Sequence, residues 1–186
     1  MTQDSSIPND FHSDSDEQPF SACKVCSAAL NNDTTYVIEK AYKRLPDGED
    51  VTLFELAICI TCAEKQANKM SAESRKTIER LMGSQEFFEK RQERWFNNWR
   101  SDWTDRCIFS DDEIKANDEY HIVGHFKGKE ILPHQTPFVI GQKMLERMQE
   151  ELSFETKEEL DNFGRQFLGP DPRLKLLLED YQFVMV

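Results

Sequence analysis

Four cysteines lie in two close pairs, each with two residues between its members. The first pair is Cys23 and Cys26, the second is Cys59 and Cys62, and 32 residues separate the two pairs. A two-residue gap lets both thiolates of a tight turn reach one ion, and two such turns complete the tetrahedron of a structural zinc, with zinc–sulfur distances of about 2.3 Å. The spacing therefore predicts that these four cysteines bind one zinc ion.

Iron is the alternative metal, because a single iron or an iron–sulfur cluster also takes four thiolates. Thioredoxin-type redox chemistry is disfavoured, since its C-x-x-C pair belongs to a βαβ pattern that neither pair here shows. A site with four protein thiolates leaves no open position for an activated water, which argues against hydrolysis at the metal. The predicted role of the ion is structural, and in small zinc fingers such an ion supplies roughly 10–16 kcal/mol of apparent binding free energy.

Cys107, His121 and His125 are the other candidates for a metal site. The two histidines are four residues apart on a predicted strand, which separates them by about 13 Å and prevents them from sharing one ion. We therefore expect a buried or interfacial Cys107 and no second site. No catalytic residues are predicted, because the chain shows no Ser/His/Asp order, apolar carboxylate pair or Gly-rich phosphate loop. An enzyme site assembled between the two halves of the chain stays open.

A predicted β-hairpin explains how the two cysteine pairs meet. Residues 34–38 and 51–58 are mostly β-branched, aromatic or aliphatic, and the Pro-Asp-Gly sequence at residues 46–48 suits a turn. Two strands of similar length return the chain to its starting point. A helix predicted over residues 60–69 begins at the second pair, so its N-terminal amides and dipole can stabilise anionic sulfur.

Two further helices are predicted after the hairpin. Ser71 is the expected N-cap of a helix over residues 72–82, and Gly83 is the expected left-handed residue that ends it. The next helix, over residues 85–100, carries aromatic residues at spacings of seven and four, which lie on one face. These residues are Phe88, Trp95 and Trp99. We expect this aromatic helix to join the two halves of the molecule.

The knuckle formed by the first pair, the hairpin and the helix that opens with the second pair together resemble a treble-clef zinc finger. Over residues 20–70 the layout is similar to that of the zinc-binding domain of ClpX-type unfoldases, although the linker between the pairs is longer here. The resemblance implies that the four cysteines are the zinc ligands and that the module binds adaptor proteins. The chain contains no G-x-x-x-x-G-K-[ST] sequence, so this test excludes a P-loop ATPase.

The second half of the chain repeats the pattern of the first. At an offset of 84 residues Cys23 aligns with Cys107, and with a turn two residues shorter the offset becomes 82. The remaining ligand positions are lost: Cys26, Cys59 and Cys62 align with Ser110, Gly141 and Met144. Chance resemblance of two acidic, helix-rich halves is the alternative. The predicted fold is α+β, with two treble-clef-like units from an internal duplication and metal in the first only.

The composition predicts five segments. They are a disordered acidic tail (residues 1–20), the zinc-binding unit (21–83), the linking aromatic helix (84–104), a degenerate metal-free repeat (105–168) and a C-terminal apolar segment (169–186). The last segment either packs on the body or docks a partner or a second copy of the chain.

The charge of the chain restricts its partners. With 23 Lys and Arg against 35 Asp and Glu the formal net charge is −12, and five acids in residues 1–20 leave −7 for the rest. Such a balance disfavours nucleic acid and anionic membranes. A nucleic-acid-associated factor is nevertheless the alternative function, because basic residues accompany the tryptophans of the aromatic helix. These residues are Lys90, Arg91, Arg94 and Arg100.

No apolar run reaches the roughly 18–20 residues of a membrane span, and residues 1–20 lack the pattern of a signal peptide. We therefore expect a cytoplasmic protein, and in that reducing compartment the cysteines are better explained as metal ligands than as disulfides. The predicted function is that of a non-enzymatic zinc-binding protein that acts through protein–protein interaction. Its partner is an unidentified protein or a second copy of the chain.

Overall fold

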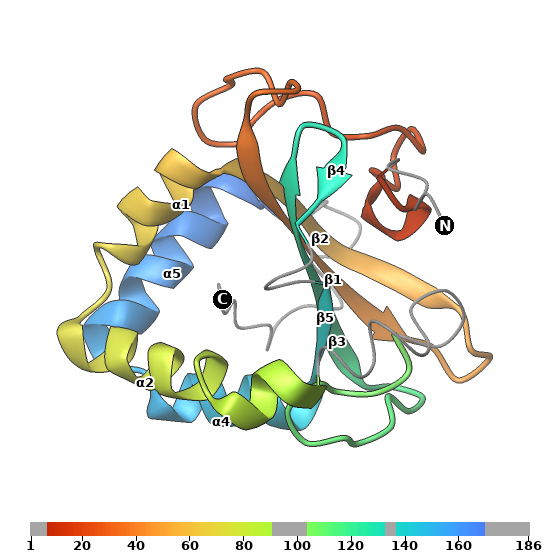
Figure 1. Cartoon of the computed structure of the whole chain (residues 1–186). Coiled ribbons are helices and arrows are strands. Elements are labelled where there is room, and N and C mark those ends of the chain that lie inside the picture. Colours follow the sequence, from red (N-terminus) through yellow and green to blue (C-terminus); the bar gives the residue numbers. More distant parts are fainter. Residues whose placement is uncertain (1–6, 91–103, 133–136, 170–186) are drawn as a thin grey trace.

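A single antiparallel sheet forms the centre of the molecule. The computed structural model describes residues 7–90, 104–132 and 137–169. The strands are β1 (Thr35–Arg44), β2 (Asp50–Cys59), β3 (Glu119–Lys127), β4 (Glu130–Ile131) and β5 (Phe138–Gly141). The order is β2-β1-β3-β4, and β5 also pairs with β3. The fold is α+β, as predicted from the sequence (Figure 1).

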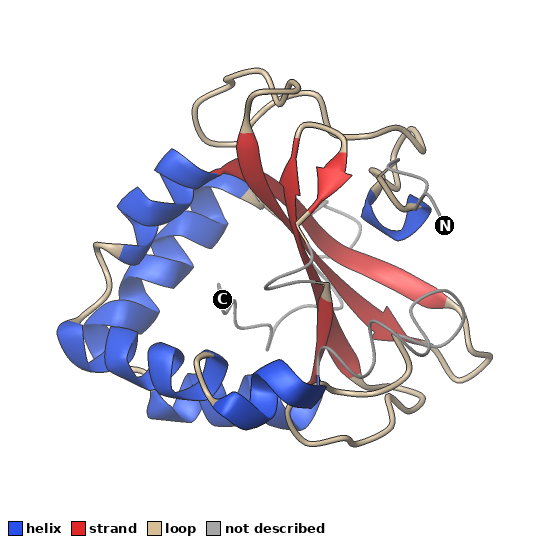
Figure 2. Ribbon diagram, in the orientation of Figure 1, coloured by secondary structure: helices blue, strands red, loops and turns tan. Residues whose placement is uncertain are grey.

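In the described part of the chain, helices cover one face of this sheet (Figure 2). They are α1 (Ile60–Ala67), α2 (Ala72–Met82), α4 (Gln142–Glu151) and α5 (Phe154–Phe167). A short 3-10 turn, Asn9–Phe11, lies on the opposite side of the sheet. None of the described helices has the length and apolar character needed to cross a membrane.

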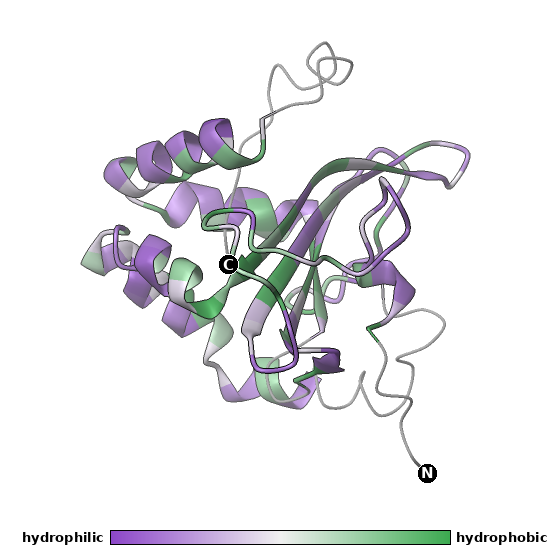
Figure 3. Cartoon of the chain, turned by 90° about the horizontal axis from the view of Figure 1, so that it is seen from above, coloured by the Kyte–Doolittle hydropathy of each residue, from purple (hydrophilic) through white to green (hydrophobic). Residues whose placement is uncertain are grey.

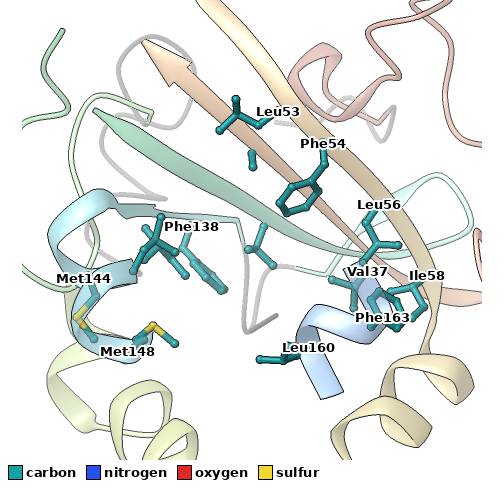
Figure 4. Close-up of a cluster of buried hydrophobic side chains, with 14 of the residues drawn as sticks. Val37, Leu53, Phe54, Leu56, Ile58, Phe138, Met144, Met148, Leu160 and Phe163 are labelled. Carbon is teal, nitrogen blue, oxygen red and sulfur yellow. The ribbon is translucent and has the colours of Figure 1, made fainter. Parts of the chain in front are cut away.

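The sheet is covered on both faces, so β1 and β3 are buried over consecutive positions rather than at alternate ones, and these positions include the charged Glu39 and Lys40. Figure 3 shows the hydrophobic strands between more hydrophilic helices and loops. On the helix side, Val37 of β1 packs with Leu160 and Phe163 of α5 in a large hydrophobic cluster (Figure 4). On the other face, Tyr36 and Ile38 of the same strand belong to a second cluster.

The two halves of the chain meet directly through β1 and β3. These strands form nine consecutive residue pairs, at whose centre Glu39 lies opposite Val123. Two stacked ring pairs flank this centre on the face opposite the helices, each with ring centroids 5.5 Å apart: Tyr36 with Phe126, and Tyr42 with Tyr120. The halves therefore share one continuous sheet, a contact that the sequence pattern did not predict.

Several hydrogen bonds recur in the two halves at the offsets found in the sequence. Lys24 N–H donates to the Ala57 carbonyl at 2.8 Å, and Ile108 N–H donates to the Val139 carbonyl at 2.9 Å. The starts of α2 and α5 are joined reciprocally: Ser71 N–H donates to Thr156 Oγ1 at 3.0 Å, and Ser153 N–H donates to Ser74 Oγ at 2.9 Å.

The predicted hairpin and the helices that follow it are confirmed, and α2 has the predicted bounds. Ser71 caps α2 by accepting a hydrogen bond from Ser74 N–H. The prediction of a left-handed Gly83 is wrong, because its φ is −90°. Its backbone N–H instead donates to the Glu79 carbonyl at 2.7 Å. A Cβ at this position would lie 2.7 Å from the same oxygen, which explains the glycine.

The prediction of a disordered tail is wrong for residues 7–20. Phe11 is fully buried and Ile7 nearly so, and both belong to the cluster on the sheet face opposite the helices. The prediction rested on the acidic composition of the segment and overlooked these two apolar residues, which lie four positions apart. Residues 1–6 lie outside the described part of the chain.

The aromatic helix is described only over residues 85–90, and its predicted continuation with Trp95 and Trp99 lies outside the described residues. At its start the buried ring is that of Phe87, which stacks on Phe109 at 5.0 Å. Phe88, which we placed on the aromatic face of this helix, is 37% exposed. The C-terminal segment beyond residue 169 is likewise outside the described residues.

Candidate metal centre

The first cysteine pair lies in a tight turn that precedes β1. Ser27 N–H donates to the Cys23 carbonyl at 2.9 Å, and Cys23 N–H donates to the Ala28 carbonyl at 2.8 Å. Ser27 has a φ of +59°, the left-handed conformation that allows the chain to reverse directly after Cys26. The turn therefore presents both thiols of the pair to one side.

The second pair lies where β2 passes into α1. Cys59 is the last residue of β2 and the N-cap of α1, and Cys62 is in the first turn of that helix. The hydrogen bond from Lys24 N–H to the Ala57 carbonyl attaches the knuckle to the edge of β2. The hairpin and this bond together bring the two pairs to one place.

The four cysteines form the one group of three or more metal-binding side chains found in the described residues. The sulfur atoms of Cys23, Cys26, Cys59 and Cys62 all lie within 4.8 Å of one another. The Cys26 and Cys59 sulfurs are 3.8 Å apart, and a tetrahedron with zinc–sulfur bonds of about 2.3 Å has edges of about 3.8 Å. The cluster thus has the donor type and the dimensions of a four-cysteine metal site.

The environments of the four thiols differ. Burial acts to raise the pKa of Cys23, but hydrogen bonds from the backbone N–H groups of Cys59, Cys26 and Val25 outweigh it and lower this pKa to about 7. Burial, with the neighbouring cysteines, raises the pKa of Cys62 to about 12. Four thiolates cannot lie this close without a compensating cation. Metal binding here would therefore release protons, and the affinity would fall at acidic pH.

Three of the four cysteines of the candidate metal centre are buried. These are Cys23, Cys59 and Cys62, whereas Cys26 is exposed. Four protein sulfurs at these distances would fill a tetrahedral coordination sphere and leave no position for substrate. The arrangement suits a structural metal rather than a catalytic one.

The corresponding turn of the second half has the same backbone without the ligands. Asp111 N–H donates to the Cys107 carbonyl at 3.0 Å, and Asp111 has a φ of +61°, as Ser27 does in the first turn. Cys107 is buried, as expected. A pocket of about 460 Å³ lies beside this turn and is lined in part by Cys107, Ser110 and Gly141.

The rejected histidine candidates do not join Cys107 in a metal cluster. His121 is 1% exposed, and its Nδ1 lies 2.8 Å from Oε1 of Glu39, which is 2% exposed. The His121 and Phe54 rings meet edge to face, with ring centroids 5.3 Å apart. Burial raises the pKa of Glu39, and His121 opposes that rise. Sequence reasoning missed this pair, although an acid within the apolar run Tyr-Val-Ile-Glu-Lys-Ala-Tyr is an available signal.

The four-cysteine cluster is the feature of the described residues that points to a role for this protein. Comparison with protein-family models, with curated proteins and with solved structures gives no match. The ClpX-like layout over residues 20–70 therefore adds an interpretation of the site but no family assignment.

Proposed function

We propose that the protein is a non-enzymatic zinc-binding protein in which Cys23, Cys26, Cys59 and Cys62 hold one structural ion. The observation that carries this proposal is the convergence of four cysteine sulfurs within 4.8 Å. The ion would fasten the knuckle before β1 to the junction of β2 and α1, and so stabilise the outer hairpin of the sheet. In the reducing cytoplasm, where we place the protein, the thiols stay available for metal.

Metal content per chain tests this proposal. We expect elemental mass spectrometry of protein purified without added metal to give one zinc per chain and no visible absorbance. Iron with visible bands would replace the structural role with electron transfer or redox sensing. Protein that is free of metal after reducing purification would contradict the assignment.

The zinc-stabilised fold would act by binding another protein. A closed metal site offers no catalytic position, and the net charge of −12 disfavours nucleic acid. Lys90 is one of the basic residues on which the nucleic-acid alternative depends. Its Nζ lies 2.8 Å from Glu86 Oε1 and donates to the Phe109 carbonyl, so this residue gives the alternative no support. Protein–protein interaction is the function that these features favour.

We also propose that each half is a treble-clef-like unit and that the chain arose by internal duplication. The reciprocal hydrogen bonds at the starts of α2 and α5 support this origin, as do the matching turns around Cys23 and Cys107. The offsets of 84 and 82 relate both sets of contacts. Two unrelated halves have no reason to share them.

A second metal site should therefore be recoverable. We expect the triple variant Ser110→Cys, Gly141→Cys and Met144→Cys, which supplies three thiols around Cys107, to raise the zinc content from one to two per chain. A Cβ on residue 141 would lie 2.9 Å from Ile114 Cδ1, the movable end of a flexible side chain. The measurement is elemental mass spectrometry of the folded protein.

The matched control adds Cys107→Ser to the triple variant. This control should return the zinc content to one per chain, because the second site then lacks a ligand. A folded triple variant that still binds a single zinc would count against the duplication.

A further inference from the structure

Residues 7–18, which we name the N-terminal arm, form a compact loop with its own internal contacts. The two ring nitrogens of His12 lie 3.1 Å from the carbonyl oxygens of Ile7 and Glu17. Ser13 N–H donates to the Gln18 carbonyl at 2.9 Å. The arm therefore contacts the sheet as a looped segment with internal hydrogen bonds rather than as one of its strands (Figure 1).

An aromatic anchor attaches the arm to the sheet face opposite the helices. The fully buried ring of Phe11 meets Phe126 edge to face, with ring centroids 5.2 Å apart. Gly124 provides the space, because a Cβ there would lie 2.7 Å from Phe11 Cε1. Ile7 adds a second buried apolar contact.

A charged anchor lies beside the aromatic one. Lys40 is fully buried, and its Nζ donates to the His12 carbonyl and to Asp14 Oδ1, both at 2.6 Å. The sheet itself supplies Glu55, whose Oε1 lies at 3.4 Å. Asp14 also accepts a hydrogen bond from Thr52, and its N–H donates to Glu55 Oε1 at 2.6 Å. The two closest partners of this buried cation thus belong to the arm.

We propose that this sheet face is a binding site for a partner protein, which inserts a segment with an aromatic residue followed three residues later by a carboxylate. The arm occupies the site in cis through Phe11 and Asp14 and so competes with the partner. The inference deepens the proposed protein–protein function by naming the surface and the chemistry of the partner. A desolvated aromatic anchor beside a buried charge is the usual core of such a recognition surface.

The charge of the arm favours its replacement. Residues 7–18 carry four acids and no base, while the chain from residue 21 onward has a net charge of −7. Like charges on the arm and the body oppose the attachment, and Lys40 compensates mainly Asp14. A partner segment that keeps the two anchors but carries fewer acids binds without this repulsion.

The test uses a fluorescent peptide with the sequence of residues 7–18 and measures its binding by anisotropy. The receptor is the full-length Phe11→Ala variant, whose own arm has lost its aromatic anchor. A tethered arm competes at an effective concentration on the order of millimolar, so we expect the peptide to bind wild type at least about tenfold more weakly than this variant. A peptide carrying Phe11→Ala should not bind.

A second receptor protects the test against misfolding of the first. The full-length Asp14→Asn variant keeps Phe11 and weakens the arm at the contacts of Asp14 with Lys40 and Thr52, so it should also bind the peptide more tightly than wild type does. Equal affinity for wild type and both variants, or no binding to folded variants, would overturn the proposal. A wild-type dimer that the peptide dissociates would also overturn it, because the occupant would then be the arm of a second copy.

Zinc content is measured on the same preparations. Variants that bind the peptide yet contain no zinc would contradict the proposed metal site and leave the binding surface supported. Variants that hold one zinc but do not bind the peptide would contradict only the binding surface.

Discussion

Replacement of Cys59 by serine is expected to release the metal and to unfold the first half of the molecule. Cys59 ends β2 and caps α1, so loss of its thiolate opens the site at the junction of the two elements. Structural zinc in small fingers is worth roughly 10–16 kcal/mol of apparent binding free energy, and this energy is coupled to folding. Elemental mass spectrometry should show near-complete loss of zinc, and circular dichroism should show loss of structure at room temperature.

The matched control is Cys107→Ser in the corresponding turn of the second half. Cys107 is buried but has no cysteine neighbours in the described residues, so its replacement should leave the zinc content at one per chain. Any loss of stability should be that of an ordinary core substitution. Equal loss of metal in the two variants would contradict the assignment of the ligands.

The second large effect is expected for His121→Phe. Phenylalanine fills the ring volume but leaves the buried Glu39 carboxylate without its partner at 2.8 Å. A buried acceptor left without its hydrogen-bond partner typically costs about 1–3 kcal/mol, and more where it is charged, so we expect a loss of at least that size in the free energy of unfolding at neutral pH. Urea denaturation followed by circular dichroism measures it.

The loss of stability in His121→Phe should depend on pH, and the direction of this dependence follows from the pKa of Glu39. The pKa of Glu39 in the folded protein is raised above its ordinary value of 4.5 by burial. A raised carboxyl pKa means that the folded state holds its proton more tightly than the unfolded state, so stability falls as pH rises through the folded pKa. Without His121 the pKa rises further. The deficit of the variant should therefore grow as the pH rises above the folded pKa of Glu39 in the wild-type protein, which itself lies above 4.5.

Glu39→Gln provides the control for the buried charge. Combined with His121→Phe it removes the ionisable group, so the double variant should be more stable at neutral pH than His121→Phe alone and should lack the pH-dependent deficit. A deficit that is the same at acidic and neutral pH would show that His121 acts by packing and not through Glu39.

Local signals in the sequence were sufficient for the candidate metal centre. The C-x-x-C spacing, the Pro-Asp-Gly turn and the serine before α2 each depend on a few neighbouring residues. Such features are reproduced because the physics that produces them is short-range: a turn, a cap and two strands of similar length. These local features bring the four thiols together, although the two cysteine pairs are far apart in the sequence.

Long-range contacts were the part that the sequence did not predict. Pairing of β1 with β3 joins residues more than 70 positions apart, and no local pattern encodes it. The arm was misjudged because its acids were counted, whereas its attachment depends on Phe11 and on a lysine within a distant strand. The choice between Phe87 and Phe88 as the buried ring depends on where Phe109 and Phe138 lie, which is again tertiary information.

The central pairing of β1 with β3 has a consequence for how the two halves can differ. In a symmetric dimer of separate identical chains paired in this register, Glu39 would face a second Glu39 across the axis, and two buried carboxylates would repel each other. Within one chain the position opposite is Val123. Lys40 corresponds likewise to Gly124, so the charged anchor and the space for Phe11 lie on different halves. Under the proposed duplication, covalent linkage of the two halves would remove the need for identical residues on both sides of the axis, and each half could then acquire a different role.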